Sequence, residues 1–213
     1  SFGIKNKSDV SLININKGKF RSIIYIKNNE KKLKFIIKKN LENYIYNILS
    51  TLAVISVYFD LDKLDKFFFN DYQFPEGRGD LNIIKLKEKK INLIDESYNS
   101  NPLSLQFALN KLNSLNTKSK RKLILLGDML ELGKFSKKLH LEAAQYINDT
   151  KIDKVYVYGK EVIETFNKIK PQKRGKILNS KKDILNFMIN DIKNGEYLMI
   201  KGSNSTGLNK ISQ

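Results

Sequence analysis

Three polar loops carry most of the side chains that could bind or transform a ligand. Each follows a short apolar run, and the loops span residues 95–102, 127–133 and 201–205. Their carboxylate, hydroxyl and amide groups suit hydrogen bonding to a polar ligand, and the ammonium of Lys201 with the backbone N–H groups beside it could bind a carboxylate. The same residue types also build ordinary turns and helix caps, so the pattern alone leaves both interpretations open.

The elements that must position these loops alternate between strands and helices. Short apolar runs at 91–94, 122–126, 154–157, 176–178 and 197–200 alternate with amphipathic segments at 102–115, 136–148, 161–169 and 181–193. Short apolar strands separated by helices predict a doubly wound α/β unit, that is, a parallel sheet covered on both faces. Ligands of such sheets bind at the carboxyl ends of the strands, where the three polar loops lie.

The first part of the chain has a different pattern. Alternating apolar and polar residues at 10–15, 20–26 and 33–37 predict an antiparallel meander, and helical periodicity predicts helices over 41–59 and 61–69. Pro75, Gly77 and Gly79 then interrupt the pattern within a few residues. We therefore expect two domains, over residues 1–79 and 80–213.

The composition narrows the class of protein. The chain has 213 residues, 41% of them hydrophobic and 29% charged, which suits a packed globular protein of one or two domains. No apolar run is long enough to cross a membrane and Cys is absent, so we expect a cytoplasmic protein without disulfides or thiolate metal sites. The net charge of +17 comes almost entirely from Lys spread along the chain, which favours a solvated basic surface over a nucleic-acid site.

Taken in order, the loop sequences resemble the motifs of a known family. DESYNSNP at 95–102, LGDMLELG at 126–133 and KGS at 201–203 resemble the carboxyl-terminal domain of the Mur ligases. SFG at 1–3, the helix that contains Asn47, and Gly77-Arg78 resemble the back half of that family's central ATP-binding domain. The resemblance implies an α/β fold with a Rossmann-like, doubly wound parallel sheet. It also implies preceding antiparallel strands and helices, and a chain that stops before the carboxyl-terminal domain ends.

The resemblance also implies an activity. The motifs are most similar to those of the member that adds D-alanyl-D-alanine to UDP-N-acetylmuramoyl-tripeptide in cytoplasmic peptidoglycan precursor synthesis. We therefore expect an ATP-dependent amide ligase that works through an acyl phosphate, with ATP and Mg²⁺ as cofactors and the tripeptide and dipeptide as partners. We expect a monomer without a nucleic-acid or membrane partner. The third residue of the acceptor peptide stays open.

Site residues follow from the matched positions. The resemblance implies ATP binding by Asn47, Arg78, Glu96 and Tyr98, and substrate binding by Asn99, Asn101, Asp128, Lys201 and Ser203. It places His140, the only histidine, behind these residues. Glu96 stands where the family usually has Asp and is expected to accept hydrogen bonds from the ribose hydroxyl groups. Asp128 fits equally well a residue that caps its own loop, and Asn47 an ordinary polar helix face.

Some family motifs do not occur in the chain. The sequence contains no Gly-Lys-Thr or Gly-Lys-Ser phosphate-binding loop, and the Mg²⁺ ligands are expected mainly before Ser1, so we expect this chain alone to be inactive. One alternative is a non-catalytic nucleotide- or peptide-binding domain, suggested by changes from the family pattern at Asn43, Tyr44 and Glu96. A second is a basic RNA-binding α/β protein, although no run interleaves aromatic residues with Arg and Gly.

Overall fold

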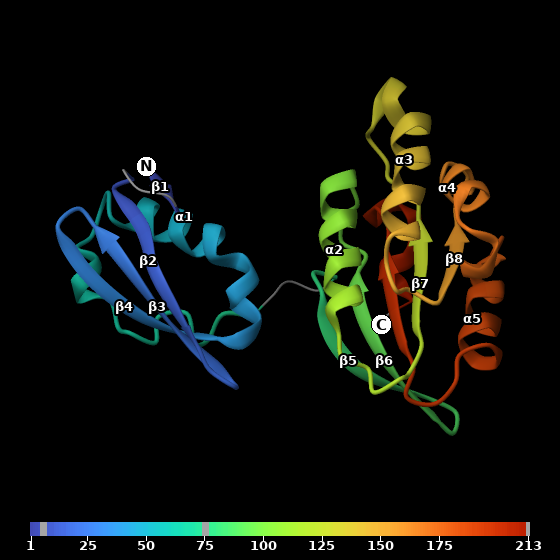
Figure 1. Ribbon diagram of the computed structural model, residues 1–213, viewed down its shortest axis with the longest axis horizontal. Helices are drawn as coiled ribbons and strands as arrows, with labels where there is room; N and C mark the ends of the chain where they lie inside the picture. The colour runs from blue at the N-terminus through green and yellow to red at the C-terminus, as the bar shows by residue number, and fades with distance from the viewer. Residues whose placement is uncertain (5–7, 74–76, 212–213) are drawn as a thin grey trace. The chain divides into compact units, whose positions relative to one another are not determined.

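The chain forms two compact units, Ser1–Gln73 and Phe74–Gln213, in a computed structural model that describes residues 1–4, 8–73 and 77–211 (Figure 1). The division falls a few residues before the expected boundary at 79. Pro75 lies outside the described residues, whereas Gly77 and Gly79 belong to the second unit.

The first unit contains a four-stranded sheet. Its strands, in spatial order, are β1 (Phe2–Gly3), β2 (Val10–Lys17), β3 (Arg21–Asn28) and β4 (Lys31–Lys38). Strands β2 to β4 form the expected antiparallel meander, and β1 pairs with β2 in parallel. Helix α1 (Ile45–Ile55) contributes buried Ile48, Leu49 and Leu52 to the unit's core.

Both helix predictions for this unit are wrong: the first helix is shorter than predicted, and the second does not form. Residues Lys39–Tyr44 form 3₁₀ turns. Helix α1 ends at Ile55, and the apolar side chains of Val57, Tyr58 and Phe59 beyond it are exposed, so burial does not stabilise a longer helix there. The segment 61–69 contains only a 3₁₀ turn at Leu61–Lys63. There the Asp65 carboxylate accepts a hydrogen bond from the Phe67 backbone N–H at 2.6 Å, and such a side-chain bond competes with helix formation.

The second unit contains a six-stranded sheet of order β5-β6-β10-β7-β8-β9. Its strands are β5 (Asp80–Leu86), β6 (Lys89–Glu96), β7 (Lys122–Gly127), β8 (Lys154–Tyr158), β9 (Arg174–Ile177) and β10 (Tyr197–Lys201). Five strands are parallel, which confirms the predicted doubly wound sheet, and β5 pairs with β6 in antiparallel orientation. Strand β5 was not predicted from the sequence. Its Leu81 and Ile83 are largely exposed, so its apolar residues do not mark a buried strand.

Helices cover both faces of this sheet. Helices α2 (Pro102–Ser114), α3 (Ser136–Asn148) and α4 (Val162–Lys168) pack on one face, and α5 (Lys181–Asn190) packs on the other. Alternate residues of each strand serve the two cores: Ile124 and Leu126 of β7 join the first, Leu123 and Leu125 the second.

The strand order brings distant loops together. Strand β10, the last in the chain, returns between β6 and β7, and Lys201 pairs in register with Glu96 on one side and Leu126 on the other (Figure 1). The three polar loops of the sequence analysis follow these three strands. They are therefore neighbours at the carboxyl edge of the sheet.

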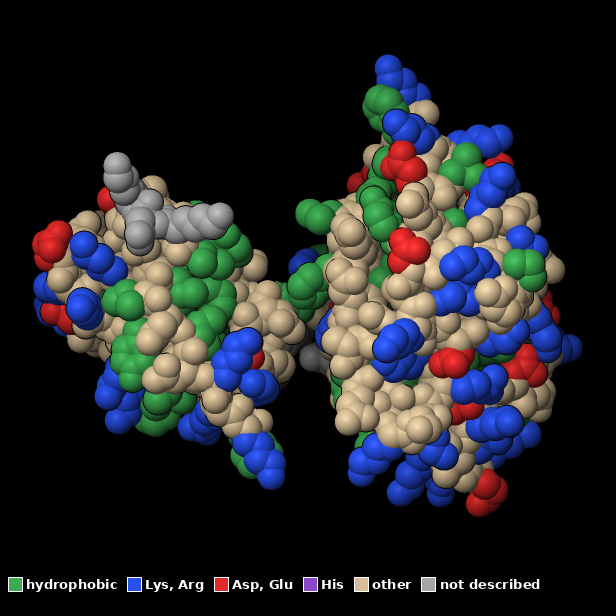
Figure 2. Space-filling view, viewed as in Figure 1, with side chains coloured by type: hydrophobic (Ala, Val, Ile, Leu, Met, Phe, Trp, Pro, Cys, Tyr) green, Lys and Arg blue, Asp and Glu red, His purple; other side chains and the backbone are tan. Residues whose placement is uncertain are grey.

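The surface offers no single dominant basic patch on the visible face. Lys and Arg side chains are spread over both units, with Asp and Glu among them (Figure 2). Among the described residues, no helix is long and apolar enough to cross a membrane.

Candidate functional site

Ser203 connects the three loops. Its backbone N–H donates to the Asp128 carbonyl oxygen at 3.0 Å. Its hydroxyl accepts from the Leu130 N–H at 2.9 Å and donates to the Ser100 carbonyl at 3.4 Å. The strand ends below can approach closely because Gly127 and Gly202 face each other: a Cβ added at Gly202 would lie 3.1 Å from the Gly127 Cα. The loops thus form one hydrogen-bonded assembly.

Lys201 lies beneath the first loop. Its side chain points to the α2 face of the sheet and is 1% exposed. The ammonium donates to the carbonyl oxygen atoms of Asn99 and, at 3.4 Å, of Glu96. Burial lowers the pKa of Lys201 to about 8, which the nearby Glu96 carboxylate partly opposes. The Lys201 ammonium therefore binds main-chain carbonyl groups. From the sequence, a substrate carboxylate was the expected partner.

Glu96 and its neighbour Asp95 face opposite sides of β6. The Asp95 carboxylate accepts hydrogen bonds from the N–H and hydroxyl of Ser97 and is buried. Glu96 points to the α2 face, where its Oε1 lies 3.4 Å from the Lys111 Nζ. Burial raises the pKa of Glu96, although Lys111 and Lys201 act in the opposite direction. Of the two carboxylates, Glu96 is thus the one on the side of Lys201.

Arg78 and Tyr98 form an exposed stacked pair. The Arg78 guanidinium carbon lies 4.1 Å from the centre of the Tyr98 ring, and the Tyr98 side chain is 47% exposed. This contact is a cation–π interaction, and the exposed position of Arg78 leaves its guanidinium N–H groups at the surface. The pair offers a flat aromatic surface and an anion-binding group side by side.

The two asparagines of the first loop have local hydrogen bonds. The Asn101 Oδ1 accepts from the Ser104 N–H at 2.8 Å, and the Ser104 hydroxyl accepts from the Asn101 N–H at 3.1 Å. This is a capping box at the start of α2, with Pro102 in the first turn. The Asn99 Oδ1 accepts from the Ser100 N–H, while the residue remains exposed. Asn101 therefore fixes the loop's exit, and Asn99 lies on its surface.

Asp128 caps a helix that starts more than thirty residues later in the chain. Its carboxylate accepts hydrogen bonds from the backbone N–H groups of Lys160 at 3.0 Å and Val162 at 2.8 Å. A Cβ at Gly159 would lie 2.3 Å from Asp128 Oδ1, so only glycine permits this approach. Asp128 thus anchors the start of α4 to the end of β7. The helix capped by Asp128 is therefore distant in sequence, whereas the sequence pattern fitted a cap of its own loop.

His140 supports the second loop from behind. It is 1% exposed, its Nε2 accepts from the Met129 N–H at 3.1 Å, and its Nδ1 lies 2.9 Å from the Ser136 carbonyl oxygen. These partners require the tautomer with hydrogen on Nδ1. The backbone carbonyl of His140 also accepts from the Thr165 hydroxyl at 2.7 Å. The imidazole therefore connects α3 to the loop after β7.

Asn47 and Lys111 lie on helices outside the three loops. Asn47 lies on the exposed face of α1 in the first unit, and its carbonyl oxygen accepts hydrogen bonds from the Ser50 and Thr51 hydroxyl groups. Lys111 was missed, although its Nζ reaches both Glu96 and the Gly79 carbonyl oxygen. The available signal was its position three residues after Ala108, at the margin of the buried face of α2.

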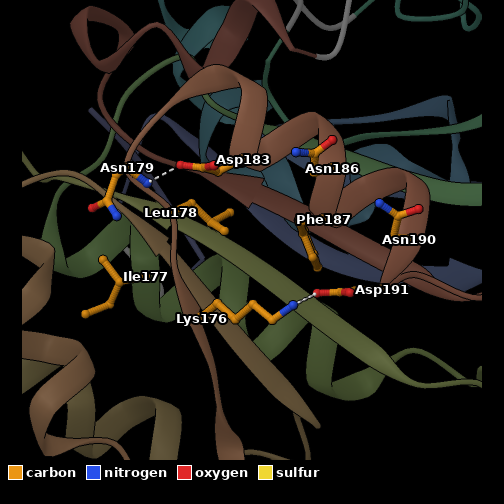
Figure 3. Close-up of a pocket in the computed structure, with 9 residues that line it drawn as sticks. All are labelled: Lys176, Ile177, Leu178, Asn179, Asp183, Asn186, Phe187, Asn190 and Asp191. Carbon is orange, nitrogen blue, oxygen red and sulfur yellow. Dashed lines mark hydrogen bonds and ion pairs between the residues drawn. The ribbon is translucent and has the colours of Figure 1, made fainter.

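A separate hollow lies between β9 and α5 (Figure 3). It has a volume of about 310 Å³, and an ion pair between Lys176 and Asp191 at 2.7 Å lies at its margin. None of its lining residues belongs to the three loops. In the part of the chain that the structure describes, no group of three His, Cys, Asp or Glu side chains could hold a metal ion.

Fold and loops together define a carboxyl-terminal ligase domain of the Mur type. The family described as "Mur ligase, glutamate ligase domain" matches residues 81–204, and the chain belongs to this family, which confirms the resemblance of its motifs.

Individual relatives have more specific names than the family as a whole. The UDP-N-acetylmuramoyl-tripeptide–D-alanyl-D-alanine ligase of Bacillus subtilis (strain 168) is 32% identical over 134 residues, which cover 62% of this chain and 29% of that protein. A crystal structure of MurF from Acinetobacter baumannii has a TM-score of 0.77 at 21% identity, covering 99% of this chain and 45% of that one. MurF from Thermotoga maritima in complex with ADP has a TM-score of 0.70 at 21% identity, covering 99% and 46%. The chain thus spans less than half the length of these relatives.

Proposed function

We propose that the chain is the carboxyl-terminal part of an ATP-dependent amide ligase that adds D-alanyl-D-alanine to UDP-N-acetylmuramoyl-tripeptide in the cytoplasm. Membership of the Mur ligases and the name of the Bacillus subtilis relative support this substrate pair. The observation that carries the proposal is the convergence of the three motif loops around Ser203 and Lys201 at the carboxyl edge of the parallel sheet.

The nucleotide would meet the exposed pair of Arg78 and Tyr98. The guanidinium supplies donors for phosphate oxygen atoms, and the Tyr98 ring supplies a face for stacking. Glu96 would accept a hydrogen bond from a ribose hydroxyl through Oε2, because its Oε1 already faces Lys111. The ADP in the Thermotoga maritima structure supports a nucleotide of this class.

The incoming dipeptide would meet the surface of the first loop. Asn99 is exposed there, whereas Asn101, Asp128, Lys201 and Ser203 hold main-chain groups in place. We assign these four residues to shaping the loops, so that backbone N–H groups and the Asn99 amide contact the substrate. Such preorganised donors stabilise developing negative charge without reorganisation, as amide ligation through an acyl phosphate requires.

The described residues supply no metal-binding cluster. We therefore assign no step through Mg²⁺ to this chain. The longer protein would act as a monomer.

The test is an NMR titration of the isotopically labelled 213-residue chain with ADP and, separately, with D-alanyl-D-alanine. We expect ADP to shift the signals of Arg78 and Tyr98, and the dipeptide to shift those of Asn99 and Ser203. L-Alanyl-L-alanine controls for specificity. Arg78→Met should weaken ADP binding about tenfold, because a charged hydrogen bond contributes about 1.5–3 kcal/mol. Arg21→Met, in the first unit, should leave it unchanged.

The possible outcomes separate the alternatives. ADP binding without dipeptide binding would favour a non-catalytic nucleotide-binding domain. If neither ligand moved the signals of the three loops at millimolar concentration, the proposal would be wrong.

A further inference from the structure

The segment 77–79 is fastened to the second unit on both sides of Arg78. The Tyr98 N–H donates to the Gly77 carbonyl oxygen at 3.1 Å, and the Gly79 N–H donates to the Asp95 carbonyl oxygen at 2.5 Å. The Gly79 carbonyl oxygen accepts a hydrogen bond from the Lys111 Nζ at 2.7 Å. Two of these bonds join backbone to backbone. The third is the only one made by a side chain, and it comes from α2.

The segment passes directly over the pair formed by Lys111 and Glu96. Gly77 and Gly79 have φ values of 74° and 93°, a region that side-chain-bearing residues rarely adopt. A Cβ at Gly79 would lie 2.3 Å from both the Glu96 Oε1 and the Lys111 Nζ. The close approach therefore depends on the absence of a side chain at 79 and on the position of the Lys111 ammonium.

Lys111 and Glu96 are largely shielded from water. Their side chains are 25% and 15% exposed, and their charged atoms lie 3.4 Å apart. Burial disfavours the charged form of the Glu96 carboxylate, and the Lys111 ammonium offsets this by its opposite charge. The same ammonium donates a hydrogen bond to the Gly79 carbonyl oxygen, next to Arg78. No other residue makes both contacts within the described ranges 1–4, 8–73 and 77–211.

We propose that Lys111 is a positioning residue: its ammonium holds segment 77–79 on the second unit and so fixes the direction in which Arg78 presents its guanidinium to a nucleotide phosphate. Arg78 then moves with the second unit and with Tyr98, on which it stacks. The identity of the ligand rests on the proposed function, whereas the holding of the segment does not.

Amide hydrogen exchange of the 213-residue chain tests the holding role without any ligand. In Lys111→Met, exchange at the Gly79 and Tyr98 N–H groups should accelerate at least tenfold, while the amides of β7 keep their wild-type rates. Lys111→Arg, which retains a cationic donor, should preserve most of the protection. Lys182→Met removes a charge from an exposed position on α5 and should change neither amide. Unchanged rates at Gly79 and Tyr98, or equal acceleration throughout the second unit, would overturn the proposal. If Lys111→Met did not fold, Lys111→Gln would be measured at the same two amides.

A double-mutant cycle tests the link to Arg78. Lys111→Met should weaken ADP binding about tenfold, and the double variant with Arg78→Met should bind no more weakly than Arg78→Met alone, because Lys111 acts through Arg78. Additive losses would show that Lys111 acts independently and would refute the positioning role. If the wild-type chain bound no ADP, the proposed function would fail, while the exchange rates would still decide whether Lys111 holds the segment.

Discussion

The buried ammonium of Lys201 should make the second unit more stable as the pH rises from 7 to 9. Burial lowers the pKa of Lys201 from 10.5 to about 8 in the folded chain, whereas the unfolded chain keeps the ordinary value. Between these two values the unfolded state binds more protons than the folded state, so the free energy of unfolding increases with pH. The destabilisation is complete below pH 8 and disappears above about pH 10.5.

The magnitude follows from the two pKa values. One pKa unit corresponds to about 1.36 kcal/mol, so the full effect is about 3 kcal/mol. Integration between pH 7 and pH 9 gives a gain of about 1 kcal/mol in the free energy of unfolding. An ammonium that reached solvent to bind a carboxylate would keep its ordinary pKa and would produce no gain in this range.

Urea unfolding of the wild type and Lys201→Met at pH 7, 8 and 9 measures this gain. Methyl NMR signals from β7 and β10 follow the second unit separately, and the difference between the two proteins cancels the other titrating groups. The wild type should gain about 1 kcal/mol relative to Lys201→Met between pH 7 and pH 9. Lys182→Met, exposed on α5, should show no such trend. A difference that stayed constant with pH would refute the buried position of the ammonium.

Other predictions concern the loop ends. Gly79→Ala should cost at least 1 kcal/mol more in urea unfolding than Gly133→Ala, because both have positive φ but a Cβ at 133 meets nothing within 4 Å. Asp95→Ala should lower stability by about 1–3 kcal/mol, since it removes a buried acceptor, whereas Glu96→Ala should mainly weaken ADP binding in a titration. Asp128→Ala should cost about 1–2 kcal/mol through loss of the α4 cap, with faster amide exchange at the start of that helix. The pure 213-residue chain should release no phosphate from ATP above the buffer blank in a colorimetric assay.

The fold of the second unit was largely predictable because its apolar periodicity corresponds to buried faces. Helix α3 begins and ends at the expected residues, and strands β7, β8 and β10 differ by one residue. Local patterns could not place β10 between β6 and β7, because they record burial but not which strands are neighbours. The helix predicted over 61–69 does not form, although the helical periodicity is present, because Asp65 offers the backbone a competing hydrogen bond.

The candidate site was predictable as a location, but the contacts of its residues were not. The rule that ligands bind at strand ends selected the three loops, and the strand order brings them together. What each polar side chain contacts depends on partners far away in the sequence: Asp128 meets Lys160 and Val162, and Lys201 meets Asn99. Sequence spacing contains no signal for such pairs.

Some loop residues bind main-chain groups and others face the surface, and this difference has a physical basis. A loop at the end of a buried strand exposes backbone groups that regular structure no longer satisfies, and each must find a partner. Here Asn101, Asp128 and Lys201 supply such partners, so their side chains bind main-chain groups and fix the loops. The groups that we assign to a ligand on the second unit are those of Arg78 and Tyr98, the Glu96 Oε2 and the loop surface at 99. Because Arg78 lies on a segment that Lys111 holds, even this small ligand-facing set depends on a partly buried charge for its geometry.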